Sequence, residues 1–206
     1  MKVHIVFAHP NINSFNGQLR KIAIDTFTQS NSEVSVSDLF QINFKASADE
    51  KDFTKLHKPD YFDLQAEQLM ALQNGTFTED IQREHRLLTQ ADLIIFQFPF
   101  WWYSMPAVLK GYIERVFSYG YAYGRAGKYL QNKQILISTS TGSPLAVFAA
   151  NNRSVEDYLK HLIVGTFELC GLKVVEPFIV HGAKQLNEEQ SEQAFNNYKQ
   201  KLISLQ

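Results

Sequence analysis

The sequence predicts a doubly wound α/β fold, a five-stranded parallel sheet of order 2-1-3-4-5 with helices on both faces. Short apolar or alternating segments recur along the chain and are separated by helical patterns, which is typical of a parallel sheet covered on both faces. The segment Leu93–Phe98 has the composition of a strand buried on both faces. Five such segments suit the order 2-1-3-4-5, in which ligands bind where the strand order reverses.

Composition indicates one globular domain. The chain has 206 residues, of which 45% are hydrophobic and 20% are charged. The formal net charge of -1 argues against a broad basic surface, so we expect no nucleic-acid partner. Cys170 is the only cysteine and Met1 leads directly into an apolar alternation, so we expect a cytoplasmic protein without disulfides. We expect no membrane span, because the uncharged run Leu93–Leu109 contains prolines and is shorter than the roughly 20 residues required.

The first strand is predicted at Lys2–Ala8, and residues 9–14 form the loop that ends it. Ser14 is expected to cap the following helix, whose apolar face carries Phe15, Leu19, Ile22, Ala23 and Phe27. The start of a helix after a first strand suits a phosphate, because its unpaired N–H groups and its dipole both favour an anion. Neither G-x-G-x-x-G nor a P-loop motif is present, so this segment alone indicates only a capped helix.

The alternating segment Val34–Leu39 predicts the second strand. The composition then shifts over about residues 44–76, which we interpret as a segment inserted into a single domain of residues 1–206. Ala46–Lys55 is charged and compatible with a helix, and Tyr61–Leu72 predicts another helix that ends near Gly75. The insertion is expected to pack beside the site.

A helix capped by Thr78 and reaching Gln90 leads into the strand at Leu93–Phe98. Pro99 should end the pairing of that strand, and Pro106 suits the first turn of the amphipathic helix that follows. Between the two prolines lie the consecutive aromatics of residues 101–103. They form either a lid on the core or the wall of a pocket for a planar ligand.

The remaining elements follow the same alternation. They are a glycine- and tyrosine-rich loop at 120–127, a strand at Gln134–Ser140, a helix at Val155–Leu169 stopped by Gly171, an edge strand at Val174–Val180 containing Pro177, and a final helix opened by Asn187.

Three loops converge at the switch point of this order, namely residues 9–16, 99–103 and 140–144. They bring together a helix start suited to phosphate, an aromatic wall and a strand end of small residues. At that strand end, backbone N–H groups can approach a ligand closely, although a plain turn explains the small residues as well. A flavin suits all three features.

The residues also match a known family in three places, at Ala91–Phe117, in the Ala-His-Pro-x4-Phe-Asn opening of Ala8–Asn16, and at Ala122–Gly124. On these motifs the chain resembles the NAD(P)H:quinone oxidoreductases of the flavodoxin-like fold. That group includes DT-diaphorase, bacterial modulator-of-drug-activity proteins and the flavoprotein that accompanies glutathione-gated potassium efflux. The resemblance covers nearly the whole chain, and its first motif is the most specific.

The resemblance implies a homodimeric enzyme that reduces quinones or related electrophilic acceptors with NADH or NADPH. Hydride would pass in a ping-pong sequence through a bound flavin, FAD or alternatively FMN, and no metal is expected. Trp102, Tyr103 and Tyr123 would border the substrate slot as catalytic residues. The implied cofactor-binding residues are His9, Ser14, Phe15, Asn16, Pro99, Phe100, Trp101, Trp102, Tyr103, Ser140, Thr141, Gly142 and Ser143.

Several positions depart from the family pattern. Phe148 takes the place of a tyrosine assigned to charge relay, and no histidine follows it before residue 161, so we expect that relay to be absent or different. Ser143 replaces the second glycine of a Thr-Thr-Gly-Gly loop. Arg125 replaces a second tyrosine, where it is either a solvated loop residue or a contact for an NADPH phosphate. Asp63 stands where FAD-binding members carry a glutamine.

Two other functions remain open from the sequence. The likeness of Phe117–Gly124 to the efflux-associated member allows a regulatory flavoprotein docked on a membrane transporter. A one-electron carrier of the flavodoxin type is the other alternative, which the near-neutral charge and the aromatic slot disfavour.

Overall fold

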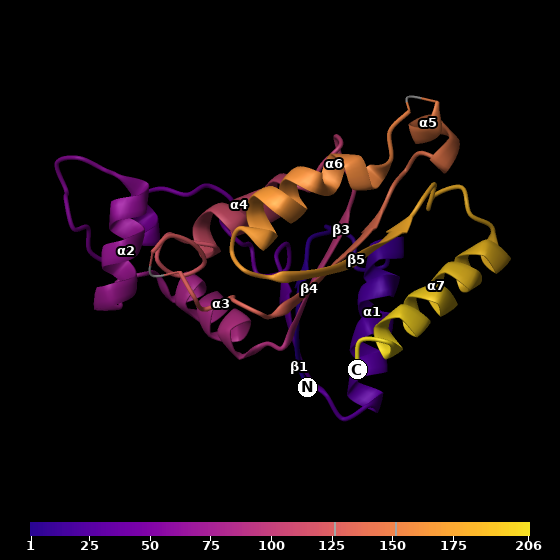
Figure 1. Ribbon diagram of the computed structural model, residues 1–206, viewed down its shortest axis with the longest axis horizontal. Coiled ribbons are helices and arrows are strands. Elements are labelled where there is room, and N and C mark those ends of the chain that lie inside the picture. The colour runs from indigo at the N-terminus through magenta and orange to yellow at the C-terminus, as the bar shows by residue number, and fades with distance from the viewer. Residues whose placement is uncertain (126, 151) are drawn as a thin grey trace.

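Five parallel strands form one sheet in the order β2-β1-β3-β4-β5, which confirms the predicted doubly wound fold (Figure 1). The computed structural model describes residues 1–125, 127–150 and 152–206; Ala126, inside the predicted loop 120–127, and Asn151 lie outside the described residues. The strands are β1 (Lys2–Phe7), β2 (Glu33–Asp38), β3 (Leu93–Pro99), β4 (Gln134–Ser140) and β5 (Lys173–Val180). As predicted, β5 is an edge strand, and Pro177 lies where its register against β4 shifts.

Helices cover both faces of the sheet (Figure 1). One face packs against α1 (Phe15–Gln29) and α7 (Glu188–Ile203). The other packs against α3 (Glu79–Gln90), α4 (Ala107–Val116) and α6 (Val155–Leu162). Because successive side chains of a strand point to opposite faces, both sides of β3 are buried, and its sequence is correspondingly apolar.

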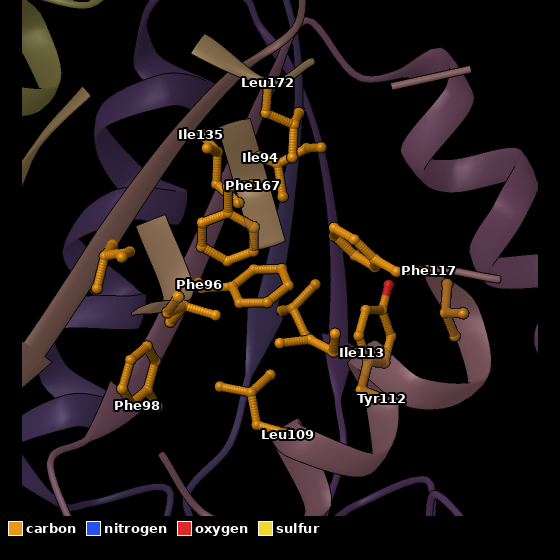
Figure 2. Close-up of a cluster of buried hydrophobic side chains, with 14 of the residues drawn as sticks. Ile94, Phe96, Phe98, Leu109, Tyr112, Ile113, Phe117, Ile135, Phe167 and Leu172 are labelled. Carbon is orange, nitrogen blue, oxygen red and sulfur yellow. The ribbon is translucent and has the colours of Figure 1, made fainter. Parts of the chain in front are cut away.

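The core between the sheet and α4 fixes both ends of the aromatic loop. The rings of Phe96, Phe117 and Phe167 lie with centroids 5.2 to 6.0 Å apart, and two of the three pairs are edge-to-face (Figure 2). Such pairs stabilise a core by about 0.5–1.5 kcal/mol each beyond their buried area. Phe96 belongs to β3 and Phe117 follows α4, so residues 100–106 connect two anchored elements.

Several predicted helices differ in the structure. The predicted helix at 155–169 divides into α6 and a π-helical turn, η2 (Ile163–Glu168). The helix α2 (Leu64–Asn74) begins later than predicted, because Asp63 caps it by accepting the N–H of Ala66 at 3.0 Å. A short helix, α5 (Leu145–Ala149), was not predicted. Thr78 occupies the N-cap position of α3, but its hydroxyl donates to Asp80 instead of capping.

The helix predicted at Ala46–Lys55 is wrong, since that stretch contains a single 3-10 turn, η1 (Glu50–Asp52). Residues before this turn lie directly on α4: a Cβ added to Gly111 would stand 1.8 Å from the carbonyl oxygen of Ala46. This contact with α4, made far along the chain, outweighs the local helical preference.

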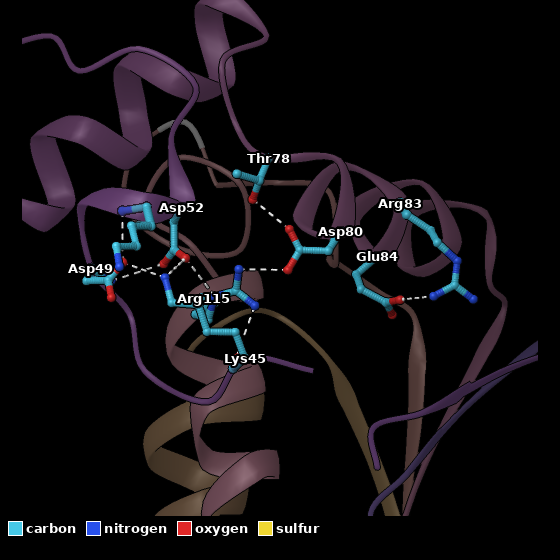
Figure 3. Close-up of polar contacts among 9 residues, drawn as sticks. Lys45, Asp49, Asp52, Thr78, Asp80, Arg83, Glu84 and Arg115 are labelled. Carbon is cyan, nitrogen blue, oxygen red and sulfur yellow. Dashed lines mark hydrogen bonds and ion pairs between the residues drawn. The ribbon is translucent and has the colours of Figure 1, made fainter. Parts of the chain in front are cut away.

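A partly buried ion network ties the segment 44–76 to α3 and α4 (Figure 3). The guanidinium of Arg115 binds Asp52 at 2.9 Å and Asp80 at 2.7 Å. Lys45 also pairs with Asp52, at 2.7 Å, and with Asp49. These contacts favour a single domain with an inserted segment, which stays a prediction.

Candidate functional site

A cleft of about 1060 Å³ opens at the carboxyl ends of β1, β3 and β4, where the strand order reverses. All the predicted cofactor-binding residues line it except Tyr103. The three predicted loops therefore meet at one place. Five residues that were not predicted also line the cleft, namely Asn11, Gln18, Ala183, Lys184 and Ser191.

The start of α1 offers unpaired backbone donors to the cleft. Ser14 Oγ accepts the N–H of Gly17 at 3.1 Å, so Ser14 caps the helix as predicted. The N–H groups of Phe15 and Asn16 have no acceptor among the described residues. Gly17 permits the loop to cross the first turn, because a Cβ there would lie 1.8 Å from the carbonyl oxygen of Ile12. This end of the cleft is suited to an anion.

His9 connects the loop after β1 with the aromatic loop. Its ring centroid lies 5.8 Å from that of Trp101, and its Nδ1 lies within 3.0 Å of both the backbone nitrogen and the carbonyl oxygen of Asn11. Burial lowers the pKa of His9, and the nearby charge of Lys184 lowers it further, against the opposing effect of the hydrogen bond to Asn11. The imidazole is therefore neutral at neutral pH.

The aromatic loop is a wall of the cleft and not a lid on the core. Trp101, Trp102 and Tyr103 are 40%, 96% and 52% exposed, whereas Phe100, at 7%, packs into the core. Trp102 and Tyr103 have positive φ values of 50° and 58°, which bulky residues rarely adopt. Two backbone hydrogen bonds between Trp101 and Ser104, of 3.0 and 2.9 Å, close a turn. This turn directs the aromatic rings of residues 101–103 outward.

The loop after β4 supplies further backbone donors. The N–H groups of Gly142 and Ser143 have no acceptor in the described part of the chain. A Cβ added to Gly142 would meet nothing within 4 Å, so this residue borders open space. The side chain of Thr141 shapes the loop instead, since its hydroxyl donates to the carbonyl oxygen of Ser143 at 2.6 Å and accepts the N–H of Gly182 at 3.2 Å.

The side chains of Asn16 and Ser140 join two of these loops. Asn16 Nδ2 donates to Ser140 Oγ at 2.8 Å, and Asn16 Oδ1 accepts from Gln97 Nε2 at 2.8 Å. All three residues are buried. The amide oxygen of Asn16 and one N–H of its Nδ2 are therefore paired, and the backbone N–H of Asn16 remains unpaired at the start of α1.

Tyr103 lines a smaller hollow of about 190 Å³ beside the cleft, which shares Phe100, Trp102 and residues 141–143 with it. Its ring lies 4.7 Å from that of Tyr158 on α6. Phe148 of α5, at the position of the missing relay tyrosine, lines the same hollow. The aromatic wall therefore continues past the cleft.

The structure does not bring Tyr123 into the cleft. Its side chain lines a separate, mostly apolar hollow of about 300 Å³ between α2, α4 and η2. Its hydroxyl accepts a hydrogen bond from Gln65 Nε2 at 3.1 Å. Within one copy of the chain, Tyr123 lines neither the cleft nor the hollow beside it.

Lys184 is the main lining residue that sequence reasoning missed. It lies in the turn after β5, is exposed, and forms no ion pair with any described residue. It lines the same cleft as the first turn of α1, so its ammonium group adds a positive charge to the N–H donors there. No motif surrounds it that could have marked it in the sequence.

The lining residues fit a flavin. The unpaired N–H groups of Phe15 and Asn16 and the ammonium group of Lys184 suit phosphate, and the exposed tryptophans suit a planar ring. The N–H groups after β4 suit an electron-rich ring edge. The volume is also adequate, since ligand pockets commonly measure about 300–1,000 Å³.

Other kinds of site have less support. Among the described residues, no three His, Cys, Asp or Glu side chains are grouped so as to hold a metal. No helix in the described ranges is long and apolar enough to cross a membrane. Cys170 is buried, and burial raises the pKa of its thiol to about 11, which suits a core residue.

Comparison with known proteins shows the family of the chain. A sequence profile for a family of flavodoxin-like fold matches residues 1–203. Ribosyldihydronicotinamide dehydrogenase (quinone) of Rattus norvegicus is 36% identical over 211 residues, covering 99% of this chain and 91% of that protein. NAD(P)H dehydrogenase (quinone) 1 of Cavia porcellus is 35% identical, covering 86% of this chain and 67% of that protein. A solved structure from Klebsiella pneumoniae, described as a candidate quinone reductase, superposes with a TM-score of 0.94 at 29% identity, covering 100% of this chain and 85% of that one. The chain belongs to this flavodoxin-like family, as the resemblance predicted.

Proposed function

We propose that this member of the flavodoxin-like family is an NAD(P)H-dependent flavoenzyme that reduces quinones or related electrophilic acceptors by two electrons. The relatives named as quinone dehydrogenases support the class of reaction. One observation carries the proposal to this chain: exposed Trp101 and Trp102 share a single cleft with unpaired N–H groups from two loops.

We propose FAD as the cofactor, with FMN as the alternative. The cleft of about 1060 Å³ is large for a ligand pocket and continues from the start of α1 to Lys184 and to Ser191 on α7, which suits the larger of the two flavins. When bound, the flavin would supply the reversible acceptance of hydride, which side chains alone do not provide.

The residues of the chain would bind and orient the flavin and would stabilise negative charge on it. Trp101 and Trp102 offer flat apolar surface against which planar rings stack. The N–H groups of Gly142 and Ser143 are held in place before any reaction, so they can stabilise negative charge without reorganisation. Phe148, which lines the neighbouring hollow, has no proton to give, so it cannot take the role of the relay tyrosine.

We also propose a homodimer in which Tyr123 borders the cleft of the second copy. Support comes from the position of Tyr123 away from its own cleft and from exposed Val164 and Leu169 on and after η2, of which Leu169 lines the same hollow as Tyr123. The free, buried thiol of Cys170 supports a cytoplasmic location. A transporter partner and one-electron transfer stay predictions.

The test uses purified protein. Mass spectrometry of the released cofactor, together with oxidation of NADH and NADPH with and without a benzoquinone, should show bound FAD and quinone-dependent turnover. Bound FMN would correct the cofactor and leave the reaction standing. A protein that holds no flavin, takes up none, and oxidises neither nucleotide in the presence of benzoquinone would contradict the proposal. Sedimentation of the same sample tests the dimer, which a monomer mass would exclude.

A further inference from the structure

A continuous chain of buried hydrogen bonds ends at the cleft. The hydroxyl of Tyr198 donates to Gln97 Oε1 at 3.4 Å, Gln97 Nε2 donates to Asn16 Oδ1 at 2.8 Å, and Asn16 Nδ2 donates to Ser140 Oγ at 2.8 Å. The four residues are buried and come from α7, β3, α1 and β4. One line of side chains therefore connects four elements on one face of the sheet.

Gln97 is an unusual residue for its position. On the same face of β3, Leu93 and Ile95 belong to the apolar core against α1 and α7. Burying an amide costs free energy unless its polar atoms are hydrogen-bonded, and both polar atoms of Gln97 are. An apolar side chain would fill this position without needing any hydrogen bond. The amide of Gln97 therefore fixes the positions of its hydrogen-bond partners, besides any contribution to the free energy of unfolding.

This series of hydrogen bonds also has a direction. Every donor points from Tyr198 toward Ser140, and aligned hydrogen bonds strengthen one another. Ser140 Oγ accepts from Asn16, so its own proton is left over, and that proton has no acceptor among the described residues. Ser140 lines the cleft, so the leftover proton is available to a bound group.

The same residues set the spacing of the three loops. Asn16 carries one of the unpaired N–H groups of α1, and Ser140 directly precedes the loop with the N–H groups of Gly142 and Ser143. The carbonyl oxygen of Ser140 accepts the N–H of Phe100 at 2.8 Å, which attaches the aromatic loop. Movement of Asn16 relative to Ser140 would therefore change the fit to phosphate and ring together.

We propose that Gln97 and Tyr198 are positioning residues for the cofactor cleft. Acting through Asn16, they hold the start of α1 against the end of β4 and direct the Ser140 hydroxyl toward an acceptor atom of the bound flavin. Neither Gln97 nor Tyr198 lines the cleft. The inference rests on the proposed flavin site.

The first test replaces Gln97 with methionine, which keeps the length of the side chain and removes both polar atoms. Flavin affinity is measured by titrating the flavin-free protein, and thermal unfolding is recorded on the same sample. We expect flavin binding to weaken roughly tenfold, the scale of one lost buried hydrogen bond. Ser37→Ala is the control, because buried Ser37 donates to Glu84 at 2.7 and 2.8 Å and does not line the cleft. It should lower the unfolding temperature without changing flavin affinity.

A second set of variants decides the matter if Gln97→Met fails to fold. Tyr198→Phe removes one long hydrogen bond and should weaken flavin binding roughly two- to threefold. Tyr112→Phe is its control, since it removes one hydroxyl bond to Glu84 from an equally buried tyrosine on the other face. Ser140→Ala should lose roughly tenfold in affinity, and Ser140→Thr, which keeps a hydroxyl, should recover most of that loss.

Two results would overturn the inference. One is flavin affinity equal to wild type in both Gln97→Met and Ser140→Ala. The other is an equal loss of flavin affinity in the control variants, compared with test variants that have the same unfolding temperature. A wild-type protein that binds no flavin would instead contradict the proposed function, so the two failures are distinguishable.

Discussion

Replacing Trp102 with alanine tests whether this residue forms the wall of the cofactor cleft or packs onto the core. Trp102 is 96% exposed, so of the roughly 250 Å² that a tryptophan offers, only about 10 Å² is buried. At about 25 cal/mol per Å², this burial contributes about 0.3 kcal/mol to the free energy of unfolding. Alanine would adopt the same positive φ as tryptophan, so the backbone strain is unchanged. We expect the unfolding of flavin-free Trp102→Ala to match that of the wild type.

The binding of flavin should respond differently. An aromatic contact contributes about 0.5–1.5 kcal/mol beyond its buried area, so its loss should weaken flavin binding roughly two- to tenfold. Chemical unfolding of the flavin-free protein and a fluorescence titration with flavin measure the two quantities on one preparation. Phe100→Ala is the comparison, because its ring is 7% exposed and its truncation should lower the free energy of unfolding by about 3–5 kcal/mol.

One pattern would refute this reasoning. If Trp102→Ala lost about 2 kcal/mol or more of unfolding free energy, yet bound flavin and reduced quinone like the wild type, the loop would be a lid on the core after all.

Three further predictions concern charge. Lys184→Glu should weaken flavin binding roughly tenfold at low ionic strength and less at high salt, because an exposed charge is screened. The control is Lys199→Glu, on an exposed part of α7 outside the cleft, which should have little effect on flavin affinity in the same fluorescence titration. Burial raises the pKa of Glu84, but the nearby imidazole of His4, the hydrogen bonds from Ser37 and the charge of Arg83 lower it more, so its folded pKa lies below its unfolded value of 4.5. The stability that Glu84 contributes is therefore present above pH 4.5 and lost as the pH falls through the folded pKa. Urea unfolding of the wild type at stepwise lower pH should show this loss. If the free energy of unfolding of Glu84→Gln fell equally steeply with pH, the prediction would be contradicted. Arg115→Met should lower the free energy of unfolding by about 1.5–3 kcal/mol and open residues 44–76 to proteolysis, because Asp52 keeps Lys45 but loses its bond to Arg115, and Asp80 loses its bond as well. Lys110→Met, which breaks an exposed pair with Glu114, should cost less than about 0.5 kcal/mol.

Local patterns were sufficient to predict the sheet. Continuous apolar runs such as Leu93–Phe98 belong to strands buried on both faces, and the alternation of strands with helices leaves few possible orders. The helix expected at Ala46–Lys55 failed for a physical reason that no local pattern carries. Gly111 and Arg115, about 60 residues further along the chain, hold this segment against α4.

The cleft was predictable where topology determined it. Once the strand order was known, the loops after β1, β3 and β4 had to meet, and the structure places them together. Lys184 was not predictable, since the turn that carries it has no motif. Gln97 did leave a signal, because an amide within an apolar strand must find hydrogen-bond partners when it is buried. Tyr123 was assigned by resemblance alone, and topology places it in a different hollow.

The aromatic loop shows why composition alone could not distinguish a lid from a wall. Bulky residues at positive φ cost about 1–2 kcal/mol each, and Trp102 and Tyr103 adopt this conformation consecutively. Such strain persists only where the surrounding structure fixes the backbone. Here Phe100 is anchored in the core and bonded to Ser140, and Trp101 is bonded to Ser104, so both ends of the turn are held. A backbone fixed in this way turns the rings toward solvent even though their side chains prefer burial. The exposure of Trp102 therefore follows from the anchors around it, which explains how a strongly apolar sequence can form the open wall of a binding site.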